Sequence, residues 1–263
     1  MKELNTLEKY NQTFYSSHLQ KTLNYMVLKT KEKIEDAYVL YVQDGRDYWE
    51  LGGLEKAVQN LVRENPELAQ HLVFVLIHPG DSMERWESFS RKGASFQQYL
   101  RFMNEEFIPE IERNIDVGKI RKRGLLGDSL AGNISLNIAA EKPEIWTHLL
   151  LQSPAVSDED IGQLEDVNLS GWDVYQSVGI YEDEFVSSIS NEKLYILTKN
   201  RQLHQTFLSN KAKVNYIETK DEHLWKVWER DLPALLEFWG QVPRPNENMV
   251  GLGACPPDPA KEA

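Results

Sequence analysis

The sequence contains almost no cysteine: Cys255 is the only one among 263 residues. A single thiol excludes an internal disulfide and favours a cytoplasmic location. Long apolar runs are also missing, because the longest, such as residues 72–77, are far too short to cross a bilayer. The first residues, MKELNTLEKYNQTF, contain no apolar core of signal-peptide length. We therefore expect a cytoplasmic protein with no signal peptide and no membrane partner.

Basic residues and metal-ligand patterns are scarce as well. The 29 basic residues face 41 acidic ones, and the net charge of −12 favours solubility over binding to nucleic acid. The six histidines are scattered, and none forms an HxxxH pattern or a Cys/His pair at ligand spacing. The glycines have neither the dinucleotide-binding nor the phosphate-loop spacing. We expect no metal and no cofactor.

What the sequence does contain is a regular alternation of short apolar runs and amphipathic stretches. Helical periodicity marks residues 53–65, 95–115, 130–142 and 225–240. Apolar runs typical of buried strands occupy residues 37–45, 71–81, 123–127, 147–156, 174–184 and 214–223. This alternation predicts an α/β fold with a mostly parallel central sheet and helices on both faces. We expect one domain over residues 1–242 and a flexible, proline-rich tail over residues 243–263.

One serine lies where the predicted strand 123–127 meets the following helix. The window Gly127-Asp128-Ser129-Leu130-Ala131 resembles the G-x-S-x-G turn that exposes the nucleophile of α/β hydrolases, with alanine at the last glycine position. Small residues at such a turn let the strand and helix backbones approach each other. Ser129 is also a residue type that favours the N-cap of a helix. The window therefore supports two interpretations, a nucleophile or a helix cap.

A nucleophilic serine needs a base and an orienting acid. Enzymes of the α/β-hydrolase fold supply these residues in the chain order Ser, acid, His. Three histidines follow Ser129. His148 lies in an apolar run and His204 in a helical stretch, whereas His223 lies between a strand and a helix, where the base is expected. A surface loop histidine would fit that position too.

The acid should follow an earlier strand, and three carboxylates, at positions 182, 183 and 184, end the run 174–184. Glu182, Asp183 and Glu184 therefore compete for this role.

Four segments together resemble the putative esterase family of α/β hydrolases, which includes enterochelin-esterase-like, feruloyl-esterase-like and S-formylglutathione-hydrolase-like enzymes. They are YVQDGRDYW (41–49), GDSLAG (127–132), SVGIYEDE (177–184) and DEHLWKVWERDLPALLEFW (221–239), and they occur in the family's order. The resemblance covers roughly residues 10–240. It implies that His223, in an H-x-W-x-x-W pattern, is the base. It also favours Glu182 over Asp183 as the acid, because Glu182 follows Gly179 by three residues.

Two departures from the family pattern affect the prediction. Asp221-Glu222 precedes His223 where the family often has two glycines. Two carboxylates beside the imidazole would favour its protonated form, which cannot act as a base. The other departure, Ala131, adds one methyl group at a tight contact.

An acyl-transfer site also needs backbone donors for the oxyanion. The N–H of Leu130, directly after the serine, is the first candidate. The resemblance places the second donor at Gly45 or Arg46, in the segment QDGRDYW, and the sequence does not decide between them.

Four further residues are candidates for the substrate pocket. Trp49, Trp86 and Trp225 are aromatic residues near these motifs, although a tryptophan is more often part of a core than of a pocket wall. Arg85 lies where family members often carry an arginine that faces the substrate, and it also fits a surface charge.

These residues predict a serine carboxylic-ester hydrolase that works through an acyl-enzyme on a small-molecule ester. An acyltransferase with the same triad is the first alternative. A binding or regulatory protein with a weak triad is the second, and Asp221-Glu222 supports it. The sequence leaves the substrate open among a siderophore lactone, an aryl ester and a small thioester, and it is compatible with a homodimer.

Overall fold

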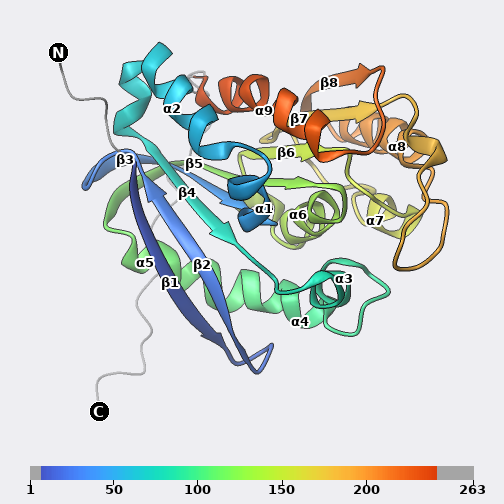
Figure 1. Cartoon of the computed structure of the whole chain (residues 1–263), viewed down its shortest axis with the longest axis horizontal. Helices are drawn as coiled ribbons and strands as arrows, with labels where there is room; N and C mark the ends of the chain where they lie inside the picture. Colours follow the sequence, from blue (N-terminus) through green and yellow to red (C-terminus); the bar gives the residue numbers. More distant parts are fainter. Residues whose placement is uncertain (1–6, 242–263) are drawn as a thin grey trace.

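The computed structural model of the chain describes residues 7–241 (Figure 1). The predicted tail at residues 243–263 lies outside the described residues. In the described part, eight strands form one sheet in the order β1-β2-β4-β3-β5-β6-β7-β8. The β1/β2 and β2/β4 pairs are antiparallel, and the other neighbouring strands are parallel. The strands are β1 (Glu8–Ser16), β2 (Lys21–Lys29), β3 (Ile34–Val42), β4 (Leu72–Ile77), β5 (Val117–Asp128), β6 (His148–Gln152), β7 (Asp173–Gly179) and β8 (Lys213–Thr219).

Helices cover both faces of this sheet (Figure 1). One buried cluster joins the sheet to α2 and α9, and the other joins it to α4, α5, α6 and α8. The predicted α/β fold with a mostly parallel sheet is therefore confirmed. The helices are α1 (Gly45–Glu50), α2 (Leu54–Glu64), α3 (Ser82–Phe89), α4 (Phe96–Arg101), α5 (Ile108–Asn114), α6 (Ser129–Glu141), α7 (Asp158–Gly162), α8 (Ile196–Ser209) and α9 (Trp225–Gly240).

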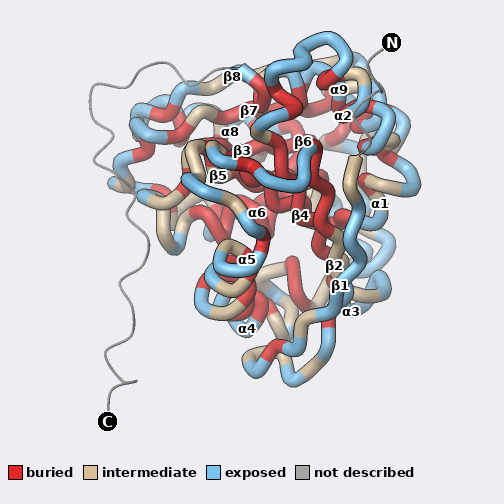
Figure 2. The backbone as a smooth tube through the Cα atoms, turned by 90° about the vertical axis from the view of Figure 1, so that its left-hand side faces the viewer, coloured by how far each residue is buried: buried red, intermediate tan, exposed pale blue. Residues whose placement is uncertain are grey.

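Burial explains why the central strands carry continuous apolar runs. Every residue of β4, Leu72–Ile77, is buried, because helices cover the sheet on both sides. Figure 2 shows buried strands inside a shell of more exposed segments. By contrast β1 is mostly exposed, and its residues lack an alternating apolar pattern. The β1–β2 hairpin was accordingly not predicted from the sequence.

The long predicted helix at 95–115 is interrupted in the structure. A π-helical turn, Phe102–Phe107, joins α4 to α5, and its apolar residues pack into the core beneath the sheet. Shorter 3₁₀ turns occupy Pro66–Gln70, Pro143–Ile145 and Glu182–Glu184.

The parallel strands bring the chemically interesting segments to one edge. The chain leaves the carboxyl ends of β3, β5, β7 and β8 at Asp44, Ser129, Glu182 and His223, respectively, or within a few residues of them. Ligands of open α/β sheets bind outside this edge. Within residues 7–241, no helix combines the length and apolar character that crossing a bilayer requires.

Candidate active site

Ser129 lies at the sharp turn between β5 and α6. Its φ is +44°, a left-handed conformation that strains a residue with a side chain and that is characteristic of functional sites. Asp128 occupies the N-cap position of α6 and makes no side-chain cap. The helix-cap interpretation of Ser129 is therefore wrong, because Ser129 is already the first residue of the helix and its hydroxyl has another partner.

Small residues at this turn let β5 and α6 pack closely against each other. A Cβ atom at Gly127 would collide with the carbonyl oxygen of Ala131, and one at Gly132 would lie 2.9 Å from Cβ of Pro154. The methyl group of Ala131 is fully buried and fits this contact. The alanine that departs from the family pattern is thus accommodated, whereas the two glycines are required.

A continuous chain of hydrogen bonds runs from the serine to a carboxylate. The Ser129 hydroxyl lies 2.7 Å from Nε2 of His223, and Nδ1 of His223 lies 2.8 Å from Oε2 of Glu182. Because a carboxylate only accepts, the ring carries its proton on Nδ1, and Nε2 is left to accept from the hydroxyl. The structure thus brings together residues 129, 182 and 223.

The Glu182 carboxylate is fully buried, and both of its oxygens have partners. Its Oε1 accepts hydrogen bonds from the Ser153 hydroxyl, at 2.7 Å, and from the Gly179 N–H, at 2.8 Å. The Trp228 indole N–H donates in turn to the Ser153 hydroxyl, at 3.2 Å. These bonds fix the carboxylate in the orientation that faces His223.

The two competing carboxylates lie elsewhere. Asp183 accepts two bonds from Thr198, one from its N–H and one from its hydroxyl, at the start of α8. Glu184 is exposed and pairs with Lys193 at 2.9 Å. Of the three acids that compete in the sequence, Glu182 alone contacts the histidine.

The acidic pair before the histidine is also directed elsewhere. The Asp221 carboxylate bonds to Arg230, and this bond lowers the pKa of Asp221. Glu222 is exposed. The backbone carbonyl of Asp221 packs so closely on Gly179 that a Cβ atom there would collide with it. The segment that carries His223 is therefore held against the segment that carries Glu182.

Aromatic rings confine the imidazole, whose side chain is only 4% exposed. The Phe185 ring lies 4.3 Å from it and the Trp228 ring 4.9 Å, measured between centroids. Trp225 packs edge-on against Trp228 at 5.1 Å. The tryptophans of the H-x-W-x-x-W pattern thus hold the histidine in place, and Trp225 belongs to this cluster.

The expected oxyanion donors lie at two helix starts. Leu130 is the second residue of α6, and Gly45 and Arg46 are the first two residues of α1. The first N–H groups of a helix have no partner within it, so they are free to bind a developing negative charge. A Cβ atom at Gly45 would lie 2.5 Å from Cβ of Leu76, so this position requires glycine.

A buried charge cluster lies beside these donors. The Arg85 N–H donates to the Asp44 carboxylate at 2.5 Å, and Asp44 itself has a left-handed φ of +53°. Asp128 is also buried, and one carboxylate oxygen of Asp44 and one of Asp128 have no protein partner. Burial raises the pKa of both carboxyls, and Asp44 raises that of Asp128 further. Arg85 therefore contacts the loop that precedes Gly45.

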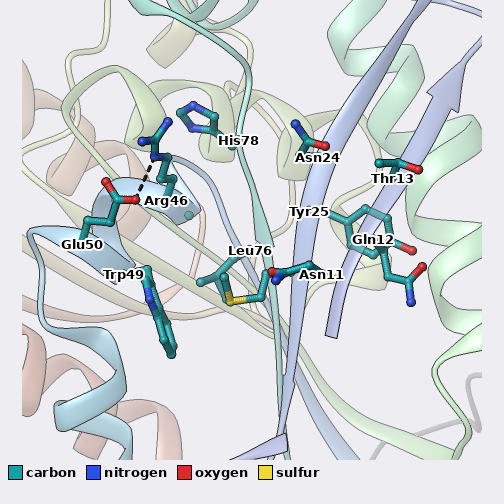
Figure 3. A pocket seen from close by; sticks show the side chains of 12 residues that line it. Asn11, Gln12, Thr13, Asn24, Tyr25, Arg46, Trp49, Glu50, Leu76 and His78 are labelled. Atoms are coloured by element: carbon teal, nitrogen blue, oxygen red, sulfur yellow. Dashed lines mark hydrogen bonds and ion pairs between the residues drawn. The ribbon is translucent and has the colours of Figure 1, made fainter. Parts of the chain in front are cut away.

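Of the four predicted pocket residues, one lines the cavity that the structure describes. Trp49 lines a cavity between α1 and the β1–β2 hairpin (Figure 3). Arg85, Trp86 and Trp225 do not line that cavity. Ser153 donates a hydrogen bond to the Glu182 carboxylate, but the sequence did not indicate this role. No local sequence pattern links Ser153 to Glu182.

Comparison with known proteins identifies the family. Residues 16–238 match the model of the Esterase family, described as "Putative esterase". The chain belongs to this family. The resemblance predicted from the sequence is thereby confirmed, and membership supports ester hydrolysis as the activity of this esterase.

The chain is also similar to individual proteins. The chain is 26% identical over 223 residues to the uncharacterized protein YjcH of Bacillus subtilis, with 82% of this chain and 90% of the relative covered. The enterobactin esterase FES of Shigella flexneri, solved in the presence of enterobactin, superposes with a TM-score of 0.72 at 16% identity. That match covers 88% of this chain and 58% of FES, so the chain spans less than two thirds of that protein. A ferulic acid esterase superposes with a TM-score of 0.66 at 16% identity, covering 89% and 98% of the two chains. At such identities the two solved structures show a shared fold.

Proposed function

We propose that the protein is a serine carboxylic-ester hydrolase that works through an acyl-enzyme. The observation that carries this proposal is the unbroken hydrogen-bond chain from Ser129 through His223 to Glu182. A serine hydroxyl becomes a nucleophile when a base accepts its proton, and Nε2 of His223 is positioned to do so.

The reaction follows from this geometry. The Ser129 oxygen attacks the ester carbonyl while its proton moves to Nε2 of His223. Glu182 stabilises the imidazolium that forms. The N–H groups of Leu130 and of the Gly45–Arg46 turn receive the negative charge that develops on the carbonyl oxygen. The protonated histidine then donates its proton to the leaving alkoxide, and water releases the acid from Ser129 by the same steps.

The substrate class we propose is a small-molecule ester. The solved structures of similar fold include an enterobactin esterase in the presence of enterobactin and a ferulic acid esterase, so siderophore lactones and aryl esters are the first compounds to assay. Hydrolysis and acyl transfer use the same acyl-enzyme, and product analysis with an added alcohol distinguishes them.

Hydrolysis of p-nitrophenyl acetate tests the proposal. Wild type should hydrolyse it, and Ser129→Ala and His223→Ala should each lose nearly all of that activity. The matched variant His204→Ala, in α8, should keep it. Equal rates for wild type and Ser129→Ala would exclude the proposed nucleophile.

A further inference from the structure

A cavity of about 500 Å³ lies between helix α1 and the β1–β2 hairpin, and the mechanism above does not use it (Figure 3). Its volume is within the range of about 300–1,000 Å³ that small-molecule sites occupy. Gly45 and Arg46 line it and also form the turn that we propose as an oxyanion donor. A molecule in the cavity would therefore contact the loop that holds the reacting carbonyl.

The hairpin wall of the cavity carries uncharged hydrogen-bonding side chains beside the apolar Met26. Asn11 pairs across the strands with Met26, and Thr13 pairs with Asn24, so these four side chains share one face of the hairpin. They line the cavity, and Asn11, Thr13 and Asn24 are exposed, with no hydrogen bond from their side chains to another residue of the range 7–241. Three exposed groups able to donate or accept hydrogen bonds thus line the cavity and are accessible to a ligand.

The remaining walls supply apolar contact and one more unpartnered group. Trp49 from α1 and Leu76 from β4 also line the cavity (Figure 3). The Nδ1 atom of His78, another lining residue, is buried and has no hydrogen-bond partner in the part of the chain that the structure describes. A buried polar atom without a partner is uncommon in folded proteins, and a ligand group would satisfy it.

The charges of the cavity cancel. Arg46 and Glu50 form an ion pair at 2.9 Å across one turn of α1. Lys9 lies outside the lining residues, with its ammonium 4.4 Å from the centroid of the Trp49 ring. Since the Arg46 and Glu50 side chains among its described lining residues pair with each other, the cavity favours an uncharged occupant with hydroxyl or amide groups on one side and an apolar surface on the other.

The order of the strands indicates which half of the ester reaches the cavity. His223 and Glu182 follow β8 and β7, on one side of Ser129, whereas the cavity lies over β2 and β4 on the other side. The leaving group must take its proton from His223, so it departs on the histidine side. The acyl group is then free to extend toward the cavity.

We infer that this cavity is the acyl-group site of the enzyme and selects uncharged acyl groups that carry hydrogen-bonding amide or hydroxyl groups. The inference rests on the proposed function, because it assigns a substrate class to the same reaction. Thr13 and Asn24 are the side chains that give the preference, since both line the cavity, are accessible and lie directly opposite each other.

The test uses two p-nitrophenyl esters of the same shape, those of N-acetyl-β-alanine and of 5-methylhexanoic acid. Wild type should show a higher kcat/KM for the amide ester, after correction for uncatalysed hydrolysis. The ratio of the two kcat/KM values should fall about tenfold in Asn24→Leu and several-fold in Thr13→Val, because each variant removes a hydrogen-bonding group. Thr22→Val is the matched control: Thr22 is exposed on the same face of β2 but outside the cavity, and its ratio should stay at the wild-type value.

Other results would overturn the inference. One is that wild type shows no preference for the amide ester. Another is that the ratio of the two kcat/KM values changes equally in Asn24→Leu, Thr13→Val and Thr22→Val. A third is that, in a series of acetate esters, the preference depends on the alcohol and not on the acyl group. If these esters are hydrolysed only when Ser129 is present and the amide preference is absent, the acyl-site inference fails while the proposed function stands. If wild type hydrolyses none of them faster than Ser129→Ala, the proposed function fails and the inference falls with it.

Discussion

At the scale of single residues, the Glu182 carboxylate has a defined role in the proposed triad, because it orients the histidine. Glu182 holds Nδ1 of His223 and is itself held by Ser153 and Gly179. A glutamine in its place would keep the shape but could accept only through one atom, and the wrong tautomer of the histidine would be stabilised. Glu182→Gln should lower kcat about 10³–10⁴-fold. Asp183→Asn is the matched control and should keep kcat near the wild-type value, because Asp183 bonds to Thr198. The reverse outcome would assign the acid to Asp183.

A second single-residue prediction concerns Arg85, which holds the loop before Gly45 by pairing with Asp44. It is the ion-pair partner of Asp44, whose side chain is only 1% exposed. Removing one partner of such a pair leaves an uncompensated buried charge. Arg85→Met should lower the free energy of unfolding by about 3 kcal/mol. It should also reduce kcat, because the loop that carries a proposed oxyanion donor loses its support.

Denaturant unfolding and steady-state kinetics measure these two effects. Arg201→Met removes an exposed partner of Glu218 and should leave the free energy of unfolding close to the wild-type value. An equally small effect of Arg85→Met would show that the Asp44 loop is held by other contacts.

At the scale of elements, the turn between β5 and α6 depends on the absence of side chains at its glycines. Gly127→Ala places a methyl group against the carbonyl oxygen of Ala131, so the strand and helix must separate. We expect a loss of about 1–3 kcal/mol in the free energy of unfolding, together with a loss of activity. Gly162→Ala, at a position with no atom within 4 Å of the added carbon, should leave stability unchanged or raise it. Thermal unfolding of both variants gives the comparison, and equal melting temperatures would contradict it.

Elements differed in how well the sequence predicted them. The buried strands β3 and β4 and the amphipathic helices α2 and α9 lie close to their predicted ranges, because burial on two faces or on one stripe leaves a clear apolar pattern. The hairpin β1–β2 left no such pattern, since most of β1 is exposed. The π-helical turn at Phe102–Phe107 was also missed, because its apolar spacing resembles that of an α-helix.

At the scale of the whole molecule, the sheet assembles a site from distant segments. Chain order and motif spacing indicated Ser129 and His223 and left three carboxylates for the acid, among which the family resemblance favoured Glu182. The support of Glu182 by Ser153 and the pairing of Arg85 with Asp44 join residues 29 and 41 positions apart. Such contacts depend on which strands become neighbours, and no local pattern in the sequence encodes them.

Burial in the sheet also makes the molecule sensitive to acid. Burial of His148 on β6 lowers its pKa to about 3 from an ordinary value of 6.5. Between these two pH values the unfolded chain binds a proton that the folded chain does not, so stability falls as the pH falls below about 6.5. The contribution of His148 should approach about 1.4 kcal/mol per pH unit.

Unfolding measured from pH 7.5 to pH 4.5 in wild type and His148→Gln isolates this effect. The stability of His148→Gln should depend less steeply on pH, so the difference between the two proteins should shrink or reverse as the pH falls. Parallel curves would show that His148 does not contribute to the acid sensitivity.

The central claim is that Ser129 carries the acyl group during the reaction. Mass spectrometry of the intact protein, quenched in acid during turnover of a p-nitrophenyl ester, tests it most directly. The account predicts one added acyl group, located by proteolysis on the peptide that contains Ser129, and no added mass in Ser129→Ala. An acyl group on another residue, or the same added mass in Ser129→Ala, would contradict it.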